Sequence, residues 1–185
     1  MRQMGVSRTI QFGCLALLLL PGCKQEERTS KEDWGDPTMR VTSTAFKEGE
    51  TIPKRYTADG ANVSPPLQWS GAPEGTKSFA LICDDPDAPS KTWIHWVAYN
   101  LPADVHELAE ADSIKSGGKQ GKNDFDKSRY GGPAPPKGKP HRYFFKVYAL
   151  DAVLDLPAEA TAQDLERKMK GHVLAHGQLM GKYSR

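Results

Sequence analysis

The chain has 185 residues, 25 of them basic and 23 acidic, and its net charge at neutral pH is +2. Two arginines are the only charged residues among the first 22, so the rest of the chain carries 23 basic and 23 acidic side chains. A balanced charge of this kind excludes a strongly basic surface, and we therefore expect no nucleic-acid partner. About 146 residues follow the N-terminal segments, enough for one hydrophobic core and too few for two.

Residues 1–22 have the pattern of an export signal. Two arginines precede an apolar stretch from Ile10 to Leu20, which is shorter than the ~20 residues of a membrane-spanning helix. The Leu-Pro-Gly-Cys tetrad that ends at Cys23 resembles a bacterial lipobox, in which the signal is cut before the cysteine and acyl chains are added to it. The segment therefore predicts an exported lipoprotein of the bacterial cell envelope, anchored to the membrane through Cys23 and facing the periplasm in a Gram-negative cell. An ordinary secretory signal with an incidental cysteine is the alternative.

Residues 23–39 are polar and rich in Lys, Glu and Asp, which predicts a lipidated, solvated tether before a domain that spans residues 40–185. Trp34 is the exception in this segment. Cys83 is the one cysteine that remains once the signal is removed and Cys23 is acylated. No internal disulfide can then form, and we expect Cys83 to be a buried structural thiol.

Short strand patterns separated by Pro- and Gly-rich turns dominate the chain as far as residue 151. The predicted strands are 39–46, 51–52, 67–69, 78–83, 93–100 and 142–150. This pattern predicts a mainly β fold, either a β-sandwich or a similar stack of sheets.

The C-terminal part predicts one or two helices. Thr161 and Asp164 have the spacing of a capping box at a helix start. An apolar stripe follows at intervals of four residues and consists of Leu165, Met169 and Val173. Gly171 is predicted to end or bend this helix, and a second, turn-rich helix is expected to run to about Met180.

His172 and His176 have a spacing that can bind a metal on one face of such a helix. The residues between them are apolar and include no glutamate that could act as the base of a metalloprotease. We therefore expect a packing or surface role for both histidines.

Two loops are expected to shape a binding pocket. The segment Asp84–Pro89 joins two predicted core strands, and its two prolines lack an N–H and fix φ, so its carboxylates are held in place. The long insertion from Asp104 to Lys139 has few strand residues and leads to His141. Loops of this length in compact domains are usually functional or mobile, and we expect this one to form a pocket wall.

Strand alternation places His141 and Tyr143 on one face of their strand and Arg142 and Phe144 on the other. A histidine therefore stands beside a phenol. Imidazoles, a phenol and backbone amides can all donate hydrogen bonds to the oxygens of a phosphate or a carboxylate.

A second histidine lies in the strand predicted at 93–100, on a face expected to hold Trp93, His95, Val97 and Tyr99. An imidazole among apolar and aromatic neighbours needs a polar partner, and Asp85 or Asp87 is expected to supply it. The carboxylate would raise the pKa of the histidine above the ~6.5 reference value.

Five motifs in series resemble the phosphatidylethanolamine-binding protein family, also called Raf kinase inhibitor-like proteins, in its bacterial branch. The resemblance covers roughly residues 40–185. The motifs are Ser64–Trp69, Asp85–Pro89 with His95, Gly131–Gly138 leading into His141–Tyr143, Gly171–Gly177, and Gly181–Tyr183.

The resemblance implies β-sandwich or Greek-key sheets with one or two C-terminal helices, and a shallow site for phosphorylated small molecules and lipid head groups. Carried over by motif, the implied ligand-binding residues are Asp85, Pro89, His95, Gly132, His141 and Tyr143, with Asp87 as the second carboxylate of the same loop. The sequence departs from the animal pattern in its short loop after Asp87 and in Pro133-Ala134, which implies a tighter rim. Binding of an anion is therefore expected more firmly than binding of a lipid.

These features favour a non-enzymatic, membrane-tethered protein that binds a small anion or a phospholipid head group, without a metal or a cofactor. An inhibitor or modulator of a partner protein, such as a kinase or a protease, is the alternative that the family's other name implies. Asp85, His95 and His141 could also form a two-histidine, one-carboxylate metal site or an acid/base pair in an enzyme. No evident nucleophile or local cluster of ligands accompanies them.

Overall fold

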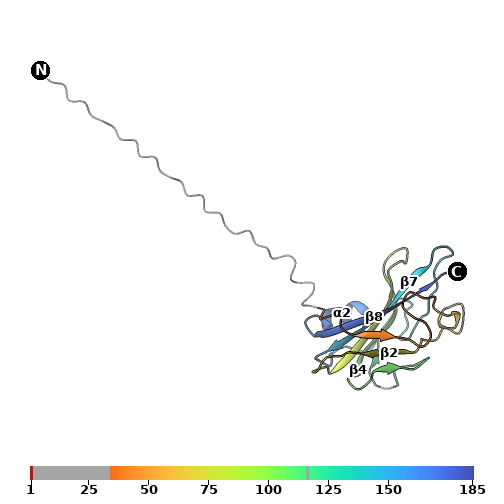
Figure 1. Cartoon of the computed structure of the whole chain (residues 1–185), viewed down its shortest axis with the longest axis horizontal. Helices are drawn as coiled ribbons and strands as arrows, with labels where there is room; N and C mark the ends of the chain where they lie inside the picture. Colours follow the sequence, from red (N-terminus) through yellow and green to blue (C-terminus); the bar gives the residue numbers. More distant parts are fainter. Residues whose placement is uncertain (2–33, 116) are drawn as a thin grey trace.

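The computed structural model describes Met1 and residues 34–115 and 117–185. The predicted signal after Met1, Cys23 and the first part of the predicted tether lie outside the described residues. Two β-sheets and one α-helix form the domain (Figure 1). In the described ranges, no helix is both long enough and apolar enough to cross a membrane.

The two sheets are antiparallel and differ in size. The smaller sheet has the order β1 (Arg40–Thr42), β2 (Leu67–Ser70), β5 (Glu107–Leu108). The larger sheet has the order β6 (Lys119–Gln120), β4 (Trp93–Pro102), β3 (Ser78–Asp85), β7 (His141–Leu150), β8 (Val173–Tyr183). A short 3₁₀ helix, η1 (Lys54–Tyr56), and the α-helix α2 (Ala162–Met169) complete the described elements. The predicted mainly β fold is confirmed.

Apolar side chains fill both sides of the larger sheet. Trp69 of β2 packs edge-on against Phe79 of β3, with ring centroids 5.6 Å apart, within the core between the two sheets. On the opposite face of the larger sheet, Leu165 and Met169 of α2 are fully buried in a second cluster with Ile82 of β3. The larger sheet is therefore the central layer of the domain.

The predicted strands at 67–69, 78–83, 93–100 and 142–150 are confirmed, each within two residues of its end. The strand predicted at 39–46 is shorter and spans only Arg40–Thr42. Thr51 makes an isolated bridge to Lys182 instead of belonging to a strand. The sequence analysis missed β5 and β6, because two-residue strands leave no alternation to detect.

Helix α2 begins as its sequence predicts. The Thr161 side chain accepts a hydrogen bond from the Asp164 backbone N–H, and the Asp164 side chain accepts one from the Thr161 backbone N–H. Val173, the third residue of the predicted stripe, lies in β8 instead, although it is buried in the same cluster.

The predicted second C-terminal helix is wrong, because this segment forms β8. Gly171 has a φ of 79° and ends α2 in the left-handed region, after which burial alternates with period two along the chain. Glycine is required where other segments cross β8: a Cβ at Gly177 would lie 2.2 Å from the carbonyl oxygen of Met39. Gly177 therefore marks a point in β8 where another backbone approaches closely.

The two C-terminal histidines consequently do not share a helix face. His172 precedes β8, and its Nδ1 lies 2.8 Å from an Asp151 carboxylate oxygen. His176 lies in β8, where its Nδ1–H donates to the carbonyl oxygen of Trp34 at 2.9 Å.

Residues 34–39 contact the domain, although the sequence assigns them to the tether. The Trp34 ring lies 6.0 Å from that of Tyr148, measured between centroids. Asp36 forms a parallel bridge with Ala175, and the Met39 N–H donates to the carbonyl oxygen of His176 at 3.1 Å. These contacts tie the chain to β8 before residue 40.

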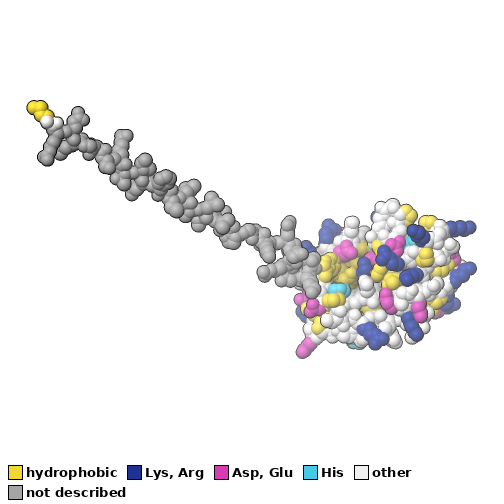
Figure 2. Space-filling view, turned by 45° about the horizontal axis from the view of Figure 1, so that its top comes forward, with side chains coloured by type: hydrophobic (Ala, Val, Ile, Leu, Met, Phe, Trp, Pro, Cys, Tyr) yellow, Lys and Arg dark blue, Asp and Glu magenta, His cyan; other side chains and the backbone are white. Residues whose placement is uncertain are grey.

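Basic and acidic side chains are interspersed over the face of the domain shown in Figure 2. The sequence has nearly equal numbers of basic and acidic residues, and on this face the two kinds of side chain are not segregated into separate patches.

Candidate functional site

A pocket of about 300 Å³ opens at one end of the larger sheet. Because β3 runs antiparallel to both of its neighbours, the end of β3 and the starts of β4 and β7 meet there. The long insertion adds Phe125 and the segment 134–136, which agrees with its predicted role as a pocket wall. The lining consists of Asp85, Ala88, Pro89, Ser90, Trp93, His95, Phe125, Ala134, Pro135, Pro136, His141 and Tyr143.

A β-bulge sets the direction of His95. Cys83 of β3 pairs with Trp96 of β4, whereas the next residue, Asp84, pairs with Ile94, which leaves His95 as the extra residue. Alternation restarts after the bulge. Val97 and Tyr99 consequently belong to the cluster beneath α2, so the prediction that they share a face with His95 is wrong.

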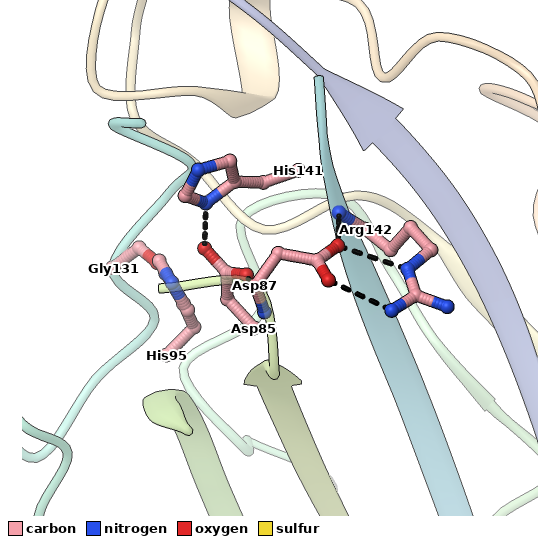
Figure 3. A network of polar contacts seen from close by, with 6 residues as sticks. All are labelled: Asp85, Asp87, His95, Gly131, His141 and Arg142. Atoms are coloured by element: carbon pink, nitrogen blue, oxygen red, sulfur yellow. Dashed lines mark hydrogen bonds and ion pairs between the residues drawn. The ribbon is translucent and has the colours of Figure 1, made fainter. Parts of the chain in front are cut away.

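Asp85 orients His141 and not His95, contrary to the predicted pairing. The Nδ1–H of His141 donates to Oδ2 of Asp85 at 2.8 Å, and the backbone N–H of Asp87 donates to Oδ1 at 2.9 Å (Figure 3). The Asp85 carboxylate is nearly buried, with 5% of its side chain exposed. Both of its oxygens are therefore engaged in fixing the loop and the imidazole of His141.

His95 has a backbone partner instead of a carboxylate. Its Nδ1–H donates to the carbonyl oxygen of Gly131 at 2.6 Å, and its ring meets the Tyr143 ring edge-on at 5.2 Å. Burial lowers the pKa of His95, although the Gly131 carbonyl and the charge of Asp85 oppose this effect. The expectation of a raised pKa is therefore wrong for His95. Near neutral pH the ring is uncharged and Nε2 carries a lone pair.

Asp87 does not line the pocket. It accepts two hydrogen bonds from the guanidinium of Arg142, at 2.9 and 2.7 Å, and one from the Arg142 backbone N–H at 2.9 Å (Figure 3). The Arg142 hydrogen bonds lower the pKa of Asp87 to about 2. Because the folded-state pKa is depressed, the stabilisation is present above the unfolded value of ~3.9 and is lost as the pH falls towards 2. Asp87 thus fastens the β3–β4 loop to the start of β7.

Gly132 also has a structural role. Its backbone N–H donates to Oδ1 of Asn62 at 2.7 Å, and a Cβ at this position would lie 2.6 Å from the carbonyl oxygen of Tyr56. The glycine allows the long loop to approach residues 56–57 closely. Pro89, His95, His141 and Tyr143 are thus the predicted residues that the pocket brings together with Asp85.

Two buried groups of the pocket have no hydrogen-bond partner among the described residues: Nε1 of Trp93 and the hydroxyl of Tyr143. The indole N–H can only donate. Burial raises the pKa of Tyr143, and the charge of Asp85 adds to this effect, so the phenol keeps its proton. An unpaired buried donor costs free energy, and both groups therefore favour an acceptor in the pocket.

The sequence analysis did not identify Trp93 or Phe125 as site residues. Strand alternation placed Trp93 on the face of His95, but no role in ligand binding was assigned to it. Phe125 comes from the long insertion, where no periodic pattern exists. Its ring packs edge-on against both Trp93 and His95, with centroids 5.5 and 5.4 Å apart.

The alternative metal site is not assembled in the described part of the chain. In residues 34–115 and 117–185, no group of three or more His, Cys, Asp or Glu side chains is placed to hold a metal ion. The Nδ1 atoms of His95 and His141 point to different partners, Gly131 and Asp85.

Comparisons with known proteins agree with this architecture. The family model for phosphatidylethanolamine-binding protein matches residues 42–184. A protein of Methanothermobacter thermautotrophicus described as UPF0098 is 51% identical over 151 residues, covering 80% of this chain and 99% of its own. A protein of Aquifex aeolicus with the same description is 52% identical over 157 residues, covering 82% and 91%.

A solved structure is similar as well. Escherichia coli YbcL, described as a new member of the mammalian family, superimposes with a TM-score of 0.76 at 36% identity, covering 80% of this chain and 99% of its own. The family match spans most of the chain, and the sheets, the helix and the pocket follow the same motifs. The chain therefore belongs to the phosphatidylethanolamine-binding protein family.

Proposed function

We propose that the domain is a non-enzymatic binding protein whose pocket holds a phosphate-type anion, either free or as part of a phosphorylated head group. The observation that carries this proposal is the pair of buried donors without acceptors, Trp93 Nε1 and Tyr143 OH, in one pocket with two imidazoles. Phosphate oxygens are strong acceptors and would satisfy both donors. Membership of the family adds support for ligand binding in general.

The two imidazoles have different roles in this proposal. His141 is held by the hydrogen bond from its Nδ1–H to Asp85, which leaves Nε2 for the ligand. His95 is uncharged near neutral pH and offers an acceptor at Nε2. His95 can therefore accept a proton from a monoprotonated phosphate, or take one from solvent when the anion binds.

The walls of the pocket suit a ligand with an apolar part. Trp93, Phe125 and Pro135 present ring surfaces beside the polar floor. A pocket of about 300 Å³ holds a small molecule or a head group.

We propose binding without turnover because the pocket contains no activated nucleophile in the described chain. Ser90 is its one aliphatic alcohol, and the Nδ1 hydrogen bonds of the imidazoles go to Gly131 and Asp85 instead of to it. A serine nucleophile needs an adjacent base.

The test of the proposal is the pH dependence of phosphate binding. A bound anion raises the pKa of His95 from its depressed value, so binding takes up a proton and affinity increases as the pH falls towards that depressed pKa. Calorimetric titration of phosphate and O-phosphoethanolamine at pH 5.5 and 8 should show tighter binding at pH 5.5. Titration in two buffers of different ionisation enthalpy should reveal the proton uptake. Binding that is equal at both pH values, or absent at both, would contradict the proposal.

We also propose that the mature protein is exported and held at a membrane of the bacterial envelope by acyl chains on Cys23. Cys23→Ser should move the protein from the membrane fraction to the soluble envelope fraction, because stable anchoring depends on those chains. Its melting temperature should stay unchanged, since the described contacts that tie the N-terminal segment to β8 are made by Trp34 and the residues that follow it. Wild-type protein found only in the soluble fraction would refute the anchor, and intact mass should show two or more acyl chains.

A further inference from the structure

A second hollow, of about 760 Å³, lies on the opposite face of the larger sheet from the anion pocket, between that sheet and the start of α2. Asp84 and Asp85 are consecutive in β3, and strand alternation directs them to opposite faces. Asp85 lines the anion pocket, and Asp84 lines the second hollow. The two carboxylates therefore serve two separate sites.

Asp84 has an unsatisfied oxygen. The residue is only 5% exposed; its Oδ2 accepts a hydrogen bond from Nζ of Lys146, but its Oδ1 has no hydrogen-bond partner among the described residues. Burial raises the pKa of Asp84, against the effect of Lys146. A buried carboxylate oxygen without a donor costs free energy, so this end of the hollow favours a hydrogen-bond donor.

The charges that line the hollow are mostly paired. Lys91 lies 2.7 Å from Asp124, and Lys122 lies 2.9 Å from Asp126. With Lys146 bound to Asp84, every lining lysine has an acidic partner. One acidic residue of the lining remains: Glu166 of α2 has no basic partner in the described chain. The lining therefore carries one more negative than positive charge.

Glu166 belongs to the same electrostatic cluster as Asp84. Burial raises the pKa of Glu166, the charge of Lys146 lowers it, and the charge of Asp84 raises it further. Two carboxylates that repel one another across one hollow are stabilised together by a cation between them.

The start of α2 does not make the hollow an anion site. The capping box between Thr161 and Asp164 already occupies helix N-terminal donors, and Asp164 adds a negative charge in the first turn. Within residues 34–115 and 117–185 no metal-ligating cluster is found, so the hollow lacks the ligand set of a metal site. An ammonium group remains, because it combines positive charge with three N–H donors.

We propose that this hollow is a binding site for a small organic amine, whose ammonium donates to Oδ1 of Asp84 and pairs with the carboxylate of Glu166. Lys146 shares the Asp84 carboxylate with the ligand through Oδ2. The ligand class is an amine that keeps at least one N–H when protonated; a primary alkylamine has the most donors, and a quaternary ammonium has none.

The test is a titration of the whole domain with n-propylamine at pH 7.5, followed by the backbone amide NMR signals of Thr92, Ile94 and Gln163, which line the hollow. Saturable shifts with a dissociation constant in roughly the millimolar range are expected for so small a ligand. Tetramethylammonium at the same ionic strength carries the same charge without donors and should bind at least about ten-fold more weakly. Equal responses to the two cations would overturn the proposal, as would the absence of saturable shifts with n-propylamine.

Two variants locate the amine. Glu166 lies on the exposed side of α2, and Glu166→Gln should weaken n-propylamine binding about ten-fold. The control is Glu74→Gln, in the turn that precedes β3, at the end of that strand remote from Asp84. It should not change the binding. Asp84→Asn should weaken binding at least as much, and Glu166→Gln remains decisive if that core variant does not fold. Binding that is equal in Glu166→Gln and Glu74→Gln would overturn the site. His141→Ala should leave amine binding unchanged, because the anion pocket lies on the other face.

Discussion

Replacing His141 with alanine is expected to weaken phosphate binding by roughly ten- to hundred-fold at pH 5.5. The substitution removes a charge-assisted hydrogen bond from Nε2, worth about 1.5–3 kcal/mol, and leaves the Asp85 carboxylate without its imidazole partner in the pocket. Both effects act in the same direction, since a bare carboxylate repels an anion. Calorimetric titration with phosphate, on wild type and variant, measures the loss directly.

The chain offers a matched control for this experiment. His172 makes the same kind of contact, with its Nδ1 2.8 Å from an Asp151 carboxylate oxygen, but it lies outside the pocket. His172→Ala should therefore leave phosphate affinity unchanged. Asp85→Asn keeps the imidazole of His141 but removes the carboxylate that orients it, so it should change the pH dependence of phosphate binding. Equal affinity of wild type and His141→Ala would refute the assignment of the pocket.

Replacing Met169 with aspartate is expected to destabilise the domain by about 3–5 kcal/mol, because it buries an unpaired charge. Met169 is the last residue of α2, and its side chain is fully buried against the larger sheet, in the cluster that also contains Ile82 of β3 and Val97 of β4. For a domain of this size the loss lowers the melting temperature by about 10 °C or more, which thermal unfolding followed by circular dichroism would detect.

Two controls separate burial from charge in that experiment. Met169→Leu keeps the volume and should cost less than about 1.5 kcal/mol. Gln163→Asp adds the same charge to the exposed first turn of α2, where the helix dipole favours it, and should leave stability nearly unchanged. A melting temperature of Met169→Asp equal to that of wild type would show that α2 does not cover the sheet in solution.

The sequence predicted the parts of the fold that depend on local patterns. The strands around Leu81 and Val147 are long apolar or alternating runs, and the capping box at Thr161 is a local hydrogen-bond pattern, so each is visible in a short window. The segment that forms β8 misled the prediction because its apolar residues also fit helical spacing. Pairing with β7, a long-range contact, decides in favour of the strand.

In the candidate site too, local motifs were predicted and long-range contacts were not. The motifs identified Asp85, His95, His141 and Tyr143, and the structure brings all four to one pocket. Their pairing could not be predicted, because the bulge at His95 breaks the alternation on which the argument from faces depends. Asp87 was assigned to the ligand, whereas its partner Arg142 lies 55 residues away in the sequence and only the fold brings the two together.

The chain enters the domain at the opposite end of β7 from the pocket. Trp34 is attached beside His176, which pairs with Tyr148 near the end of β7, whereas His141 stands at the start of that strand. Seven residues of extended strand separate the two points by about 23 Å. An anchor reached through Trp34 would therefore be attached at the end of the domain remote from the mouth of the pocket. Ligand entry and membrane attachment would then not compete for the same end of the domain.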